Sequence, residues 1–180
     1  MKNTLIKLTV CTMLFACNAG NKEPGAASGS DTTSAAAGTF QQDVNFLHQQ
    51  LGNMVLLQSA SDSSKVLVAG DYQARVMTSS ARGFEGKSYG WITYALIDSK
   101  KYNPHINAFG GEERFWLGPE GGQYALFFPP GKPFGFDDWQ TPGVIDTAAY
   151  DMTEKTGQEV TYTKSGTLQN YAGTNFNVGI

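Results

Sequence analysis

Hydrophobic positions at helical spacing open the folded part of the chain. They are Phe40, Val44, Leu47 and Leu51. Thr39 precedes this stripe and Gln42 follows three residues later, which is the capping-box pattern of a helix N-terminus. Gly52 comes directly after the last apolar position, as expected where a helix stops. The pattern predicts one N-terminal amphipathic helix at the start of the domain.

After this stripe the periodicity changes to short apolar and β-branched runs, which are typical of strands. The runs are residues 54–58, 65–69, 72–78, 89–97, 124–128, 159–164 and 174–180. Turn residues separate them, as in the segments 62–64, 110–111, 129–131 and 165–166. Many short strands divided by turns predict a mainly β fold, an antiparallel β-sandwich over residues 39–180.

The last apolar run predicts a strand with nothing after it. Phe176, Val178 and Ile180 alternate with polar residues like a strand that faces a core, and Ile180 is the last residue of the sequence. An unpaired apolar edge favours aggregation, and complete domains avoid it. We therefore expect the domain to be the N-terminal part of a larger sandwich. A complete small domain that ends on a central strand is the alternative.

The first residues have the pattern of an export signal. Lys2 and Lys7 make the start positively charged, and a short, mostly apolar run follows over residues 8–15. This run is too short for a helix that spans a bilayer, which takes about 20 apolar residues. It fits the apolar region of a signal peptide over residues 1–16.

The end of that signal, Leu14-Phe15-Ala16-Cys17, resembles the lipobox of bacterial lipoproteins. The resemblance implies cleavage before Cys17 and lipid on this cysteine, because several acyl chains anchor a protein stably to a membrane. An ordinary signal peptide with a chance cysteine is the alternative. Residues 17–38 then comprise the lipidated cysteine and a flexible tether rich in Ala, Gly, Ser and Thr. Asn18 is not the aspartate that retains some lipoproteins at the inner membrane, which favours the outer membrane of a Gram-negative bacterium.

Charge and cysteine content narrow the range of partners. The chain carries 13 basic and 16 acidic groups, and it becomes more acidic when Lys2 and Lys7 leave with the signal. No Lys/Arg cluster gives the electrostatic footprint of a nucleic-acid or anionic-lipid site. The cysteines are Cys11, inside the signal, and Cys17. We therefore predict a domain without a disulfide framework and without a nucleic-acid partner.

Residues 110–123 follow neither helix nor strand periodicity. The segment combines five glycines and a proline with three carboxylates, an arginine and a tryptophan. Glycine supplies backbone freedom, and long loops in compact domains are often functional. The composition predicts a functional loop.

This loop resembles the recurring string GGEDRFWLGPEGGQ of an uncharacterised family of bacterial secreted and lipid-anchored proteins. Residues 110–123 match it, with Glu113 where that family usually has aspartate. Further matching segments are residues 75–78, 88–92, 105–107, 139–142 and 145–146. The resemblance implies a β-supersandwich similar to galactose mutarotases, in chains longer than this one. It brings no established activity.

His105 and Glu120 are the candidate catalytic residues. A mutarotase-like reaction needs an acid at the ring oxygen and a base at the anomeric hydroxyl, and a histidine with a carboxylate can supply this chemistry. His105 follows Pro104, in an extended or turn context. A surface or structural histidine is the alternative.

The candidate ligand-binding residues are Glu113, Arg114, Trp116 and Gln123. Arg114 offers a planar fork of donors for a carboxylate or for several hydroxyls. Trp116 lies among glycines and offers a face on which a sugar can stack. The alternative for Arg114 is an ion pair with a glutamate of the loop, and we expect Glu112 to have such a structural role. Trp91 lies in a strand pattern, which favours a core position.

The sequence contains no metal-ligand spacing of the HExxH or EF-hand kind and no GxGxxG. We therefore expect no metal, no cofactor and no nucleotide. The candidate residues indicate a lipid-anchored envelope protein that binds carbohydrate through residues 110–123. The alternatives are a mutarotase-like enzyme that uses His105 and Glu120, and a structural envelope protein.

Overall fold

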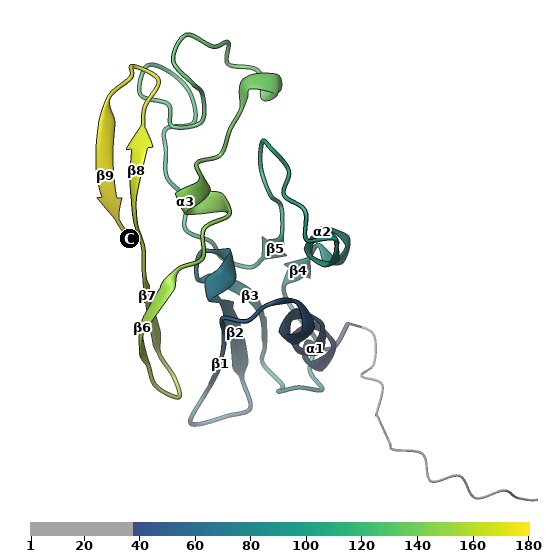
Figure 1. The fold of residues 1–180 in the computed structure, drawn as a ribbon. Helices are drawn as coiled ribbons and strands as arrows, with labels where there is room; N and C mark the ends of the chain where they lie inside the picture. The colour runs from purple at the N-terminus through teal and green to yellow at the C-terminus, as the bar shows by residue number, and fades with distance from the viewer. Residues whose placement is uncertain (1–37) are drawn as a thin grey trace, which may run out of the picture. The chain divides into compact units, whose positions relative to one another are not determined.

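The computed structural model describes residues 38–180. The predicted signal peptide, the lipidation at Cys17 and nearly all of the predicted tether lie outside the described residues. The described part is mainly β, with antiparallel sheets and few helices (Figure 1). This architecture is consistent with the predicted β-sandwich.

Helix α1, Phe40–Gln50, is the amphipathic helix that the sequence predicts. The Thr39 hydroxyl accepts a hydrogen bond from the Gln42 backbone N–H at 3.4 Å, which satisfies one of the free donors of the first turn. Phe40, Val44 and Leu47 form its buried face. The N-cap at Thr39 and the apolar stripe are therefore both confirmed.

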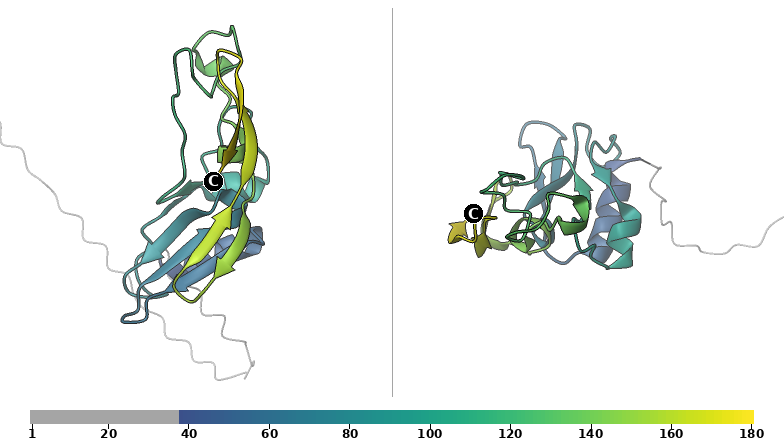
Figure 2. Two further views of the ribbon diagram at one scale, coloured as in Figure 1. Left: turned by 90° about the vertical axis from the view of Figure 1, so that its left-hand side faces the viewer. Right: turned by 90° about the horizontal axis from the view of Figure 1, so that it is seen from above.

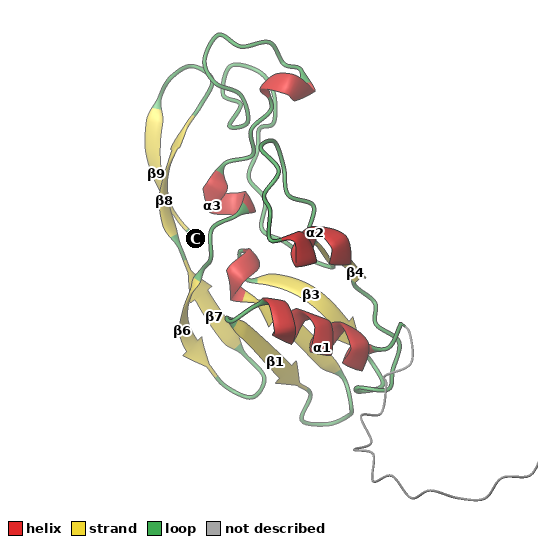
Figure 3. Cartoon of the chain, turned by 45° about the vertical axis from the view of Figure 1, so that its right-hand side comes forward, coloured by secondary structure: helices red, strands yellow, loops and turns green. Residues whose placement is uncertain are grey.

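A three-stranded sheet follows, with β1 at Met54–Gln58, β2 at Lys65–Ala69 and β3 at Arg75–Ser80. The strands are antiparallel in the order β1-β2-β3. Helix α1 lies across one face of this sheet (Figure 3), and its apolar face joins a buried cluster with residues such as Leu67 and Met77. The predicted bounds of β1 and β2 are confirmed. The predicted strand at residues 72–78 begins later, because a 3-10 turn occupies Gly70–Tyr72.

The predicted strand at residues 89–97 is wrong over most of its length. A two-residue strand, β4 at Trp91–Ile92, is followed by helix α2 at Tyr94–Ser99. A short apolar run fits either type of element, and here Ile97 is buried from a helix. The expected core position of Trp91 is also wrong, because its side chain is 65% exposed.

A long irregular segment joins the sheet to the C-terminal hairpins. It begins with β5, Gly110–Gly111, which pairs with β4, and it includes a 3-10 turn at Phe136–Asp138 and helix α3 at Gly143–Asp146. The predicted strand at residues 124–128 is wrong. Its buried backbone is satisfied by loop partners: the Leu126 N–H donates to the Pro119 carbonyl, and the Phe127 carbonyl accepts from the Gln140 N–H.

Two antiparallel hairpins end the chain. The first pairs β6, Asp151–Lys155, with β7, Val160–Thr163, and the second pairs β8, Ser165–Gln169, with β9, Asn175–Gly179. β7 and β9 lie within predicted runs, whereas β6 and β8 are additional strands. In Figures 1 and 2 these hairpins lie on the side of the β1–β3 sheet opposite helices α1 and α2.

The domain has two hydrophobic clusters. One forms between α1, α2 and the three-stranded sheet and includes Phe40, Leu67 and Phe109. The other forms around residues 125–128 and includes Ile145 of α3 and Leu168 of β8. Within residues 38–180, no helix is long and apolar enough to cross a membrane.

Candidate functional site

The glycine-rich loop begins by pairing with the free edge of β3. The Val76 N–H donates to the Glu113 carbonyl at 3.1 Å, and the Glu112 N–H donates to the Val76 carbonyl at 2.8 Å. The Glu112 carboxylate accepts hydrogen bonds from the backbone N–H and the hydroxyl of Ser79. Glu112 therefore has a structural role, as expected, although its partner is a serine and not Arg114.

The close approach of the loop backbone to β3 and β4 requires glycine at positions 110 and 111. Their φ angles are +94° and +109°, a region that other residues rarely adopt. A Cβ on Gly110 would lie 1.9 Å from the Trp91 carbonyl oxygen, and one on Gly111 would lie 2.7 Å from Arg75 Cδ. The paired glycines therefore place the loop directly against Arg75.

Arg114 points from the loop toward helix α3. Its Nη2 lies 3.6 Å from Asp146 Oδ1 and donates to the Ile145 carbonyl. The alternative of an ion pair between Arg114 and a loop glutamate is therefore wrong, because the carboxylate comes from Asp146, far along the chain. The guanidinium also lies over the Trp116 ring, 4.3 Å from its centroid.

Trp116 is packed on more than one side. Its ring is stacked on the buried Phe127 with centroids 5.1 Å apart, and its Nε1–H donates to Glu120 Oε1 at 2.9 Å. With Arg114 over the ring as well, the indole is largely a structural part of the site. The open aromatic surface next to it belongs to Phe115, which is 39% exposed.

A cavity of about 340 Å³, here called the loop cavity, lies beside these residues. Its walls are Gln73, Ala74, Val76, Glu113, Arg114, Phe115, Trp116, Tyr150, Tyr162 and Ile180. Three of the four predicted ligand-binding residues, Glu113, Arg114 and Trp116, thus share one cavity. Gln123 does not line it and is exposed in the turn before residues 125–128.

Several residues that line the loop cavity were not predicted from the sequence. Tyr150 precedes β6 and Tyr162 lies in β7, so only the tertiary fold brings them to the loop. Gln73 and Ala74 have φ angles of +60° and +52°, which are strained for residues with a side chain. Strain of this kind gathers at functional sites, and no sequence signal marks it here.

The polar groups beneath this cavity are buried and densely bonded. Arg75 is 2% exposed, and it donates to the Gly110 carbonyl at 2.7 Å and to Gln73 Oε1 at 3.0 Å. Burial and the nearby Arg114 charge lower the pKa of Arg75 to about 10, so it is still a cation at neutral pH. Burial raises the pKa of Tyr150 and of Tyr162, which therefore keep their hydroxyl protons.

The two predicted catalytic residues lie outside the walls of the loop cavity. His105 Nδ1 is 2.7 Å from the Trp139 carbonyl oxygen, which fixes the proton on Nδ1 in the neutral ring and leaves Nε2 as the acceptor. Glu120 is exposed and accepts from Trp116 Nε1. Their pairing as acid and base stays a prediction.

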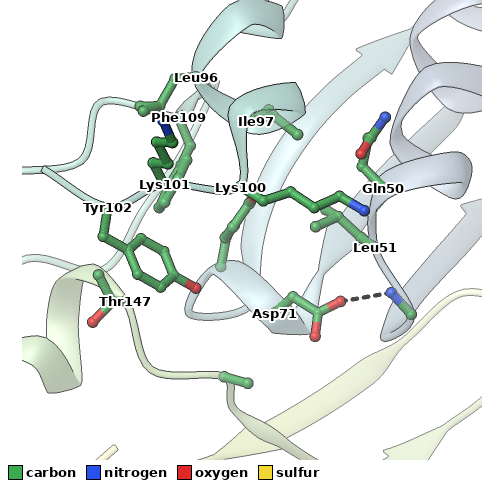
Figure 4. Close-up of a pocket in the computed structure, with 13 residues that line it drawn as sticks. Gln50, Leu51, Asp71, Leu96, Ile97, Lys100, Lys101, Tyr102, Phe109 and Thr147 are labelled. Carbon is green, nitrogen blue, oxygen red and sulfur yellow. Dashed lines mark hydrogen bonds between the residues drawn. The ribbon is translucent and has the colours of Figure 1, made fainter.

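A second cavity, here called the helix cavity, lies beside α2 and has a volume of about 270 Å³. The stacked rings of Tyr72 and Phe109 contribute to its apolar wall, and the exposed Tyr102 lies at its rim. Lys100 extends toward Gln50 and Leu51 (Figure 4). The Asp71 carboxylate accepts a hydrogen bond from the Gly52 N–H. No feature of the sequence had indicated this cavity.

The part of the chain that the structure describes has no candidate metal site. No group of three or more His, Cys, Asp or Glu side chains there could hold a metal ion. Two acidic residues near the loop cavity are instead held by protein partners. Asp146 pairs with Arg114 and Asn107, and Glu112 with Ser79.

The fold and the site together define a mainly β domain with a cavity built on a glycine-rich loop. The chain belongs to a family of unknown function, DUF6786, whose model matches residues 38–180. No curated protein and no solved structure matches it. Membership of an uncharacterised family is thus confirmed over the domain, whereas the lipid anchor and the likeness to galactose mutarotases stay predictions.

Proposed function

We propose that this protein is a lipid-anchored envelope protein that binds carbohydrate in the loop cavity. The observation that carries the proposal is the convergence of aromatic rings and polar donors on one cavity. Arg114, Phe115, Tyr150 and Tyr162 all line it, from three separate parts of the chain. The Tyr162 hydroxyl is buried and has no hydrogen-bond partner among the described residues.

This combination suits a sugar for a simple physical reason. A sugar ring presents apolar C–H faces, which pack on aromatic rings, and hydroxyls, which need hydrogen-bond partners. Phe115 supplies an exposed ring, and Arg114 supplies guanidinium donors on the cavity wall. The predicted role of Trp116 changes in this proposal: the indole supports Arg114, and Phe115 is the stacking surface.

A glycan array probed with the full-length protein tests the proposal. We expect Phe115→Ala to weaken binding of the array ligands severalfold, because an aromatic contact is worth about 0.5 to 1.5 kcal/mol beyond its buried area. Tyr124→Ala is the matched control, since Tyr124 is also exposed but does not line the cavity. Absence of any glycan ligand, or equal losses in the two variants, would contradict carbohydrate binding at this site.

The lipid anchor rests on the lipobox-like ending at Cys17. Metabolic labelling with a clickable fatty acid should mark the wild-type protein and not Cys17→Ser. Equal labelling of both proteins would rule out Cys17 as the acylated residue. Fractionation of the labelled cells then tests the proposed outer-membrane location.

A further inference from the structure

A groove with uncharged walls runs along strand β8, apart from the loop cavity. Here called the β8 groove, it has a volume of about 370 Å³, which is within the range of ligand sites in proteins. Its walls are formed by residues 126–130, 140–144 and 167–169, and it shares no lining residue with the loop cavity. Strand β8 lies between β9 and helix α3 (Figure 1), so the groove lies on the side of β8 that faces away from β9.

The edge of β8 on this side has free backbone groups. In an antiparallel pair, residues that bond to the partner strand alternate with residues that point away from it. Lys164 and Ile180 exchange two backbone hydrogen bonds, of 2.9 and 2.8 Å, so the even-numbered residues of β8 bond to β9. Thr167 and Gln169 therefore direct their N–H and carbonyl groups away from β9. Among the described residues no strand pairs with this edge, and these four groups have no backbone partner.

Contacts at both ends set the length of the groove. Beyond Gln169, the Tyr171 N–H donates to the Ala125 carbonyl at 2.8 Å. At the other end Gly166 lies against Val144, where an added Cβ would be 3.0 Å from Val144 Cγ2. Between these contacts residues 167–169 line the groove, which corresponds to about 10 Å of extended chain.

The free edge of β8 lacks the features that keep other chains from pairing with a strand. Native proteins protect free edges with charged side chains and with bulges. Strand β6 has both, because three of its five residues are charged and its pairing with β7 is irregular. Strand β8 has no charged residue, and its register with β9 is regular. The fold therefore leaves the edge of β8 open to pairing.

The opposite wall offers apolar surface and one free carboxamide. Pro129, Pro130 and Pro142 line it, and a proline has no backbone N–H. Gln140 is exposed, and its backbone N–H donates to the Phe127 carbonyl at 2.8 Å. The Gln140 side-chain amide can both donate to and accept from a peptide group that lies in the groove.

We propose that the β8 groove binds a short extended segment of another polypeptide, uncharged over about three residues, as an added strand on β8. The free N–H and carbonyl groups of Thr167 and Gln169 repeat every two residues, which is the repeat of an extended peptide backbone. A charged side chain in the groove would lie against apolar walls without an opposite charge, so the segment is uncharged. This inference goes beyond the proposed carbohydrate function and does not depend on it.

A display library of random heptapeptides, selected on the full-length protein, tests the proposal. We expect the selected peptides to have three successive uncharged residues at their centre. Synthetic copies with N-methyl groups at alternate residues lose the N–H groups of one edge. By calorimetry, one of the two alternate sets should weaken binding about tenfold or more, because about two backbone hydrogen bonds are lost.

Two proline variants of the same hairpin locate the added strand. Thr167→Pro removes an N–H on the groove side, and Asn177→Pro removes the N–H of its cross-strand partner on the opposite edge. Each variant also removes the 2.8 Å side-chain hydrogen bond between these two residues, so their effects on the hairpin are matched. We expect Thr167→Pro to weaken peptide binding about tenfold or more and Asn177→Pro to leave it unchanged.

Hydrogen exchange of the wild-type protein gives a second test that needs no variant. With a selected peptide bound, the amides of Thr167 and Gln169 should exchange about tenfold more slowly, whereas those of Asn175 and Asn177 should not change. Unchanged exchange at Thr167 and Gln169 would overturn the added strand even if Thr167→Pro fails to fold.

The remaining outcomes separate this inference from the carbohydrate proposal. Failure to select any peptide, selection of peptides with charged centres, or equal losses in the two proline variants overturns the peptide assignment. Glycan binding that Thr167→Pro removes and Phe115→Ala leaves intact would make the groove a sugar site, which also overturns it. Phe115→Ala should leave peptide binding unchanged, because Phe115 does not line the β8 groove.

Discussion

The loop cavity and the helix cavity have similar volumes, about 340 and 270 Å³, but they hold their charges differently. In the loop cavity the cation is Arg114, fixed by Asp146 and by the Ile145 carbonyl. In the helix cavity the cations are Lys100 and Lys101, both exposed. One cavity has a rigid charge built into the fold, and the other has mobile charges at its edge.

This difference between a fixed arginine and exposed lysines indicates which cavity is built to bind a specific ligand. An exposed lysine interacts with water at little cost to folding, so its presence beside a cavity implies nothing specific. A buried guanidinium is unfavourable unless it is paired. The fold retains the buried Arg75, and it holds the partly exposed Arg114 against the buried Asp146. The cavity with the fixed charge is therefore the better candidate for specific binding.

The largest effect should come from Asp146→Asn, which keeps the size of the side chain but leaves Arg114 without its carboxylate. Breaking a buried charge network typically costs about 3 to 5 kcal/mol of unfolding free energy. Asp71→Asn is the matched control in the helix cavity, where the carboxylate accepts two backbone N–H groups. For Asp71→Asn we expect a loss of about 1 to 2 kcal/mol of unfolding free energy, measured by urea denaturation. Equal losses would show that Asp146 does not neutralise Arg114.

A smaller loss is expected when a methyl group is added beside Arg75. Gly111→Ala places a Cβ at a φ of +109°, 2.7 Å from Arg75 Cδ and 2.9 Å from the Val76 carbonyl oxygen. Backbone strain and overpacking each cost about 1 to 3 kcal/mol, so we expect about 2 to 4 kcal/mol in all. Gly52→Ala, at the wall of the helix cavity, meets nothing within 4 Å and should change stability little. Tolerance of Gly111→Ala would mean that the loop can move away from β3.

Alkaline pH should reveal a titration specific to the helix cavity. Burial, with the nearby Tyr102 and Asp71, raises the pKa of Tyr72 from 10.0 to about 12. A raised pKa in the folded state contributes stability below pH 10 that is lost as the pH rises toward 12. We expect Tyr72→Phe to reduce this loss by about 1 to 2 kcal/mol, from urea denaturation at about pH 9 and about pH 11.5.

The lowered pKa of Arg75 acts in the opposite direction above pH 10. Its main cause is burial, which the two proteins share, and its smaller interaction with Tyr72 is removed in Tyr72→Phe. Tyr162→Phe provides the comparison from the loop cavity, where burial also raises the pKa of the tyrosine. Parallel pH profiles for wild type and Tyr72→Phe would contradict the assignment to Tyr72.

The sequence predicted the elements whose signals are local. Helix α1 has a cap and an apolar stripe within one segment, and β1 and β2 are short apolar runs bounded by turn residues. Strand β6, Asp151–Lys155, has no such signal because all five residues are exposed. The position of β6 depends on its pairing with β7, and this pairing cannot be predicted from the local sequence pattern.

The same limit applies to the site. Residues 110–123 were predicted to be a functional loop from their composition, and three of the predicted ligand-binding residues meet at one cavity. The partner of Arg114 was missed because Asp146 is far along the chain and is placed by helix α3. Tyr150 and Tyr162 were missed for the same reason: tertiary packing alone brings them to the loop.

The smallest expected effect concerns the exposed cation of the helix cavity. Lys100→Gln removes one charge from the rim and keeps a long polar side chain, so the unfolding free energy should change by less than about 0.5 kcal/mol. Affinity for a glycan that binds in the loop cavity should also stay the same, because Lys100 does not line that cavity. A Lys100→Gln protein that folds normally but binds that glycan severalfold more weakly would reverse the comparison. In that case the exposed charges would recognise the ligand, and the pair of Arg114 and Asp146 would serve only the fold.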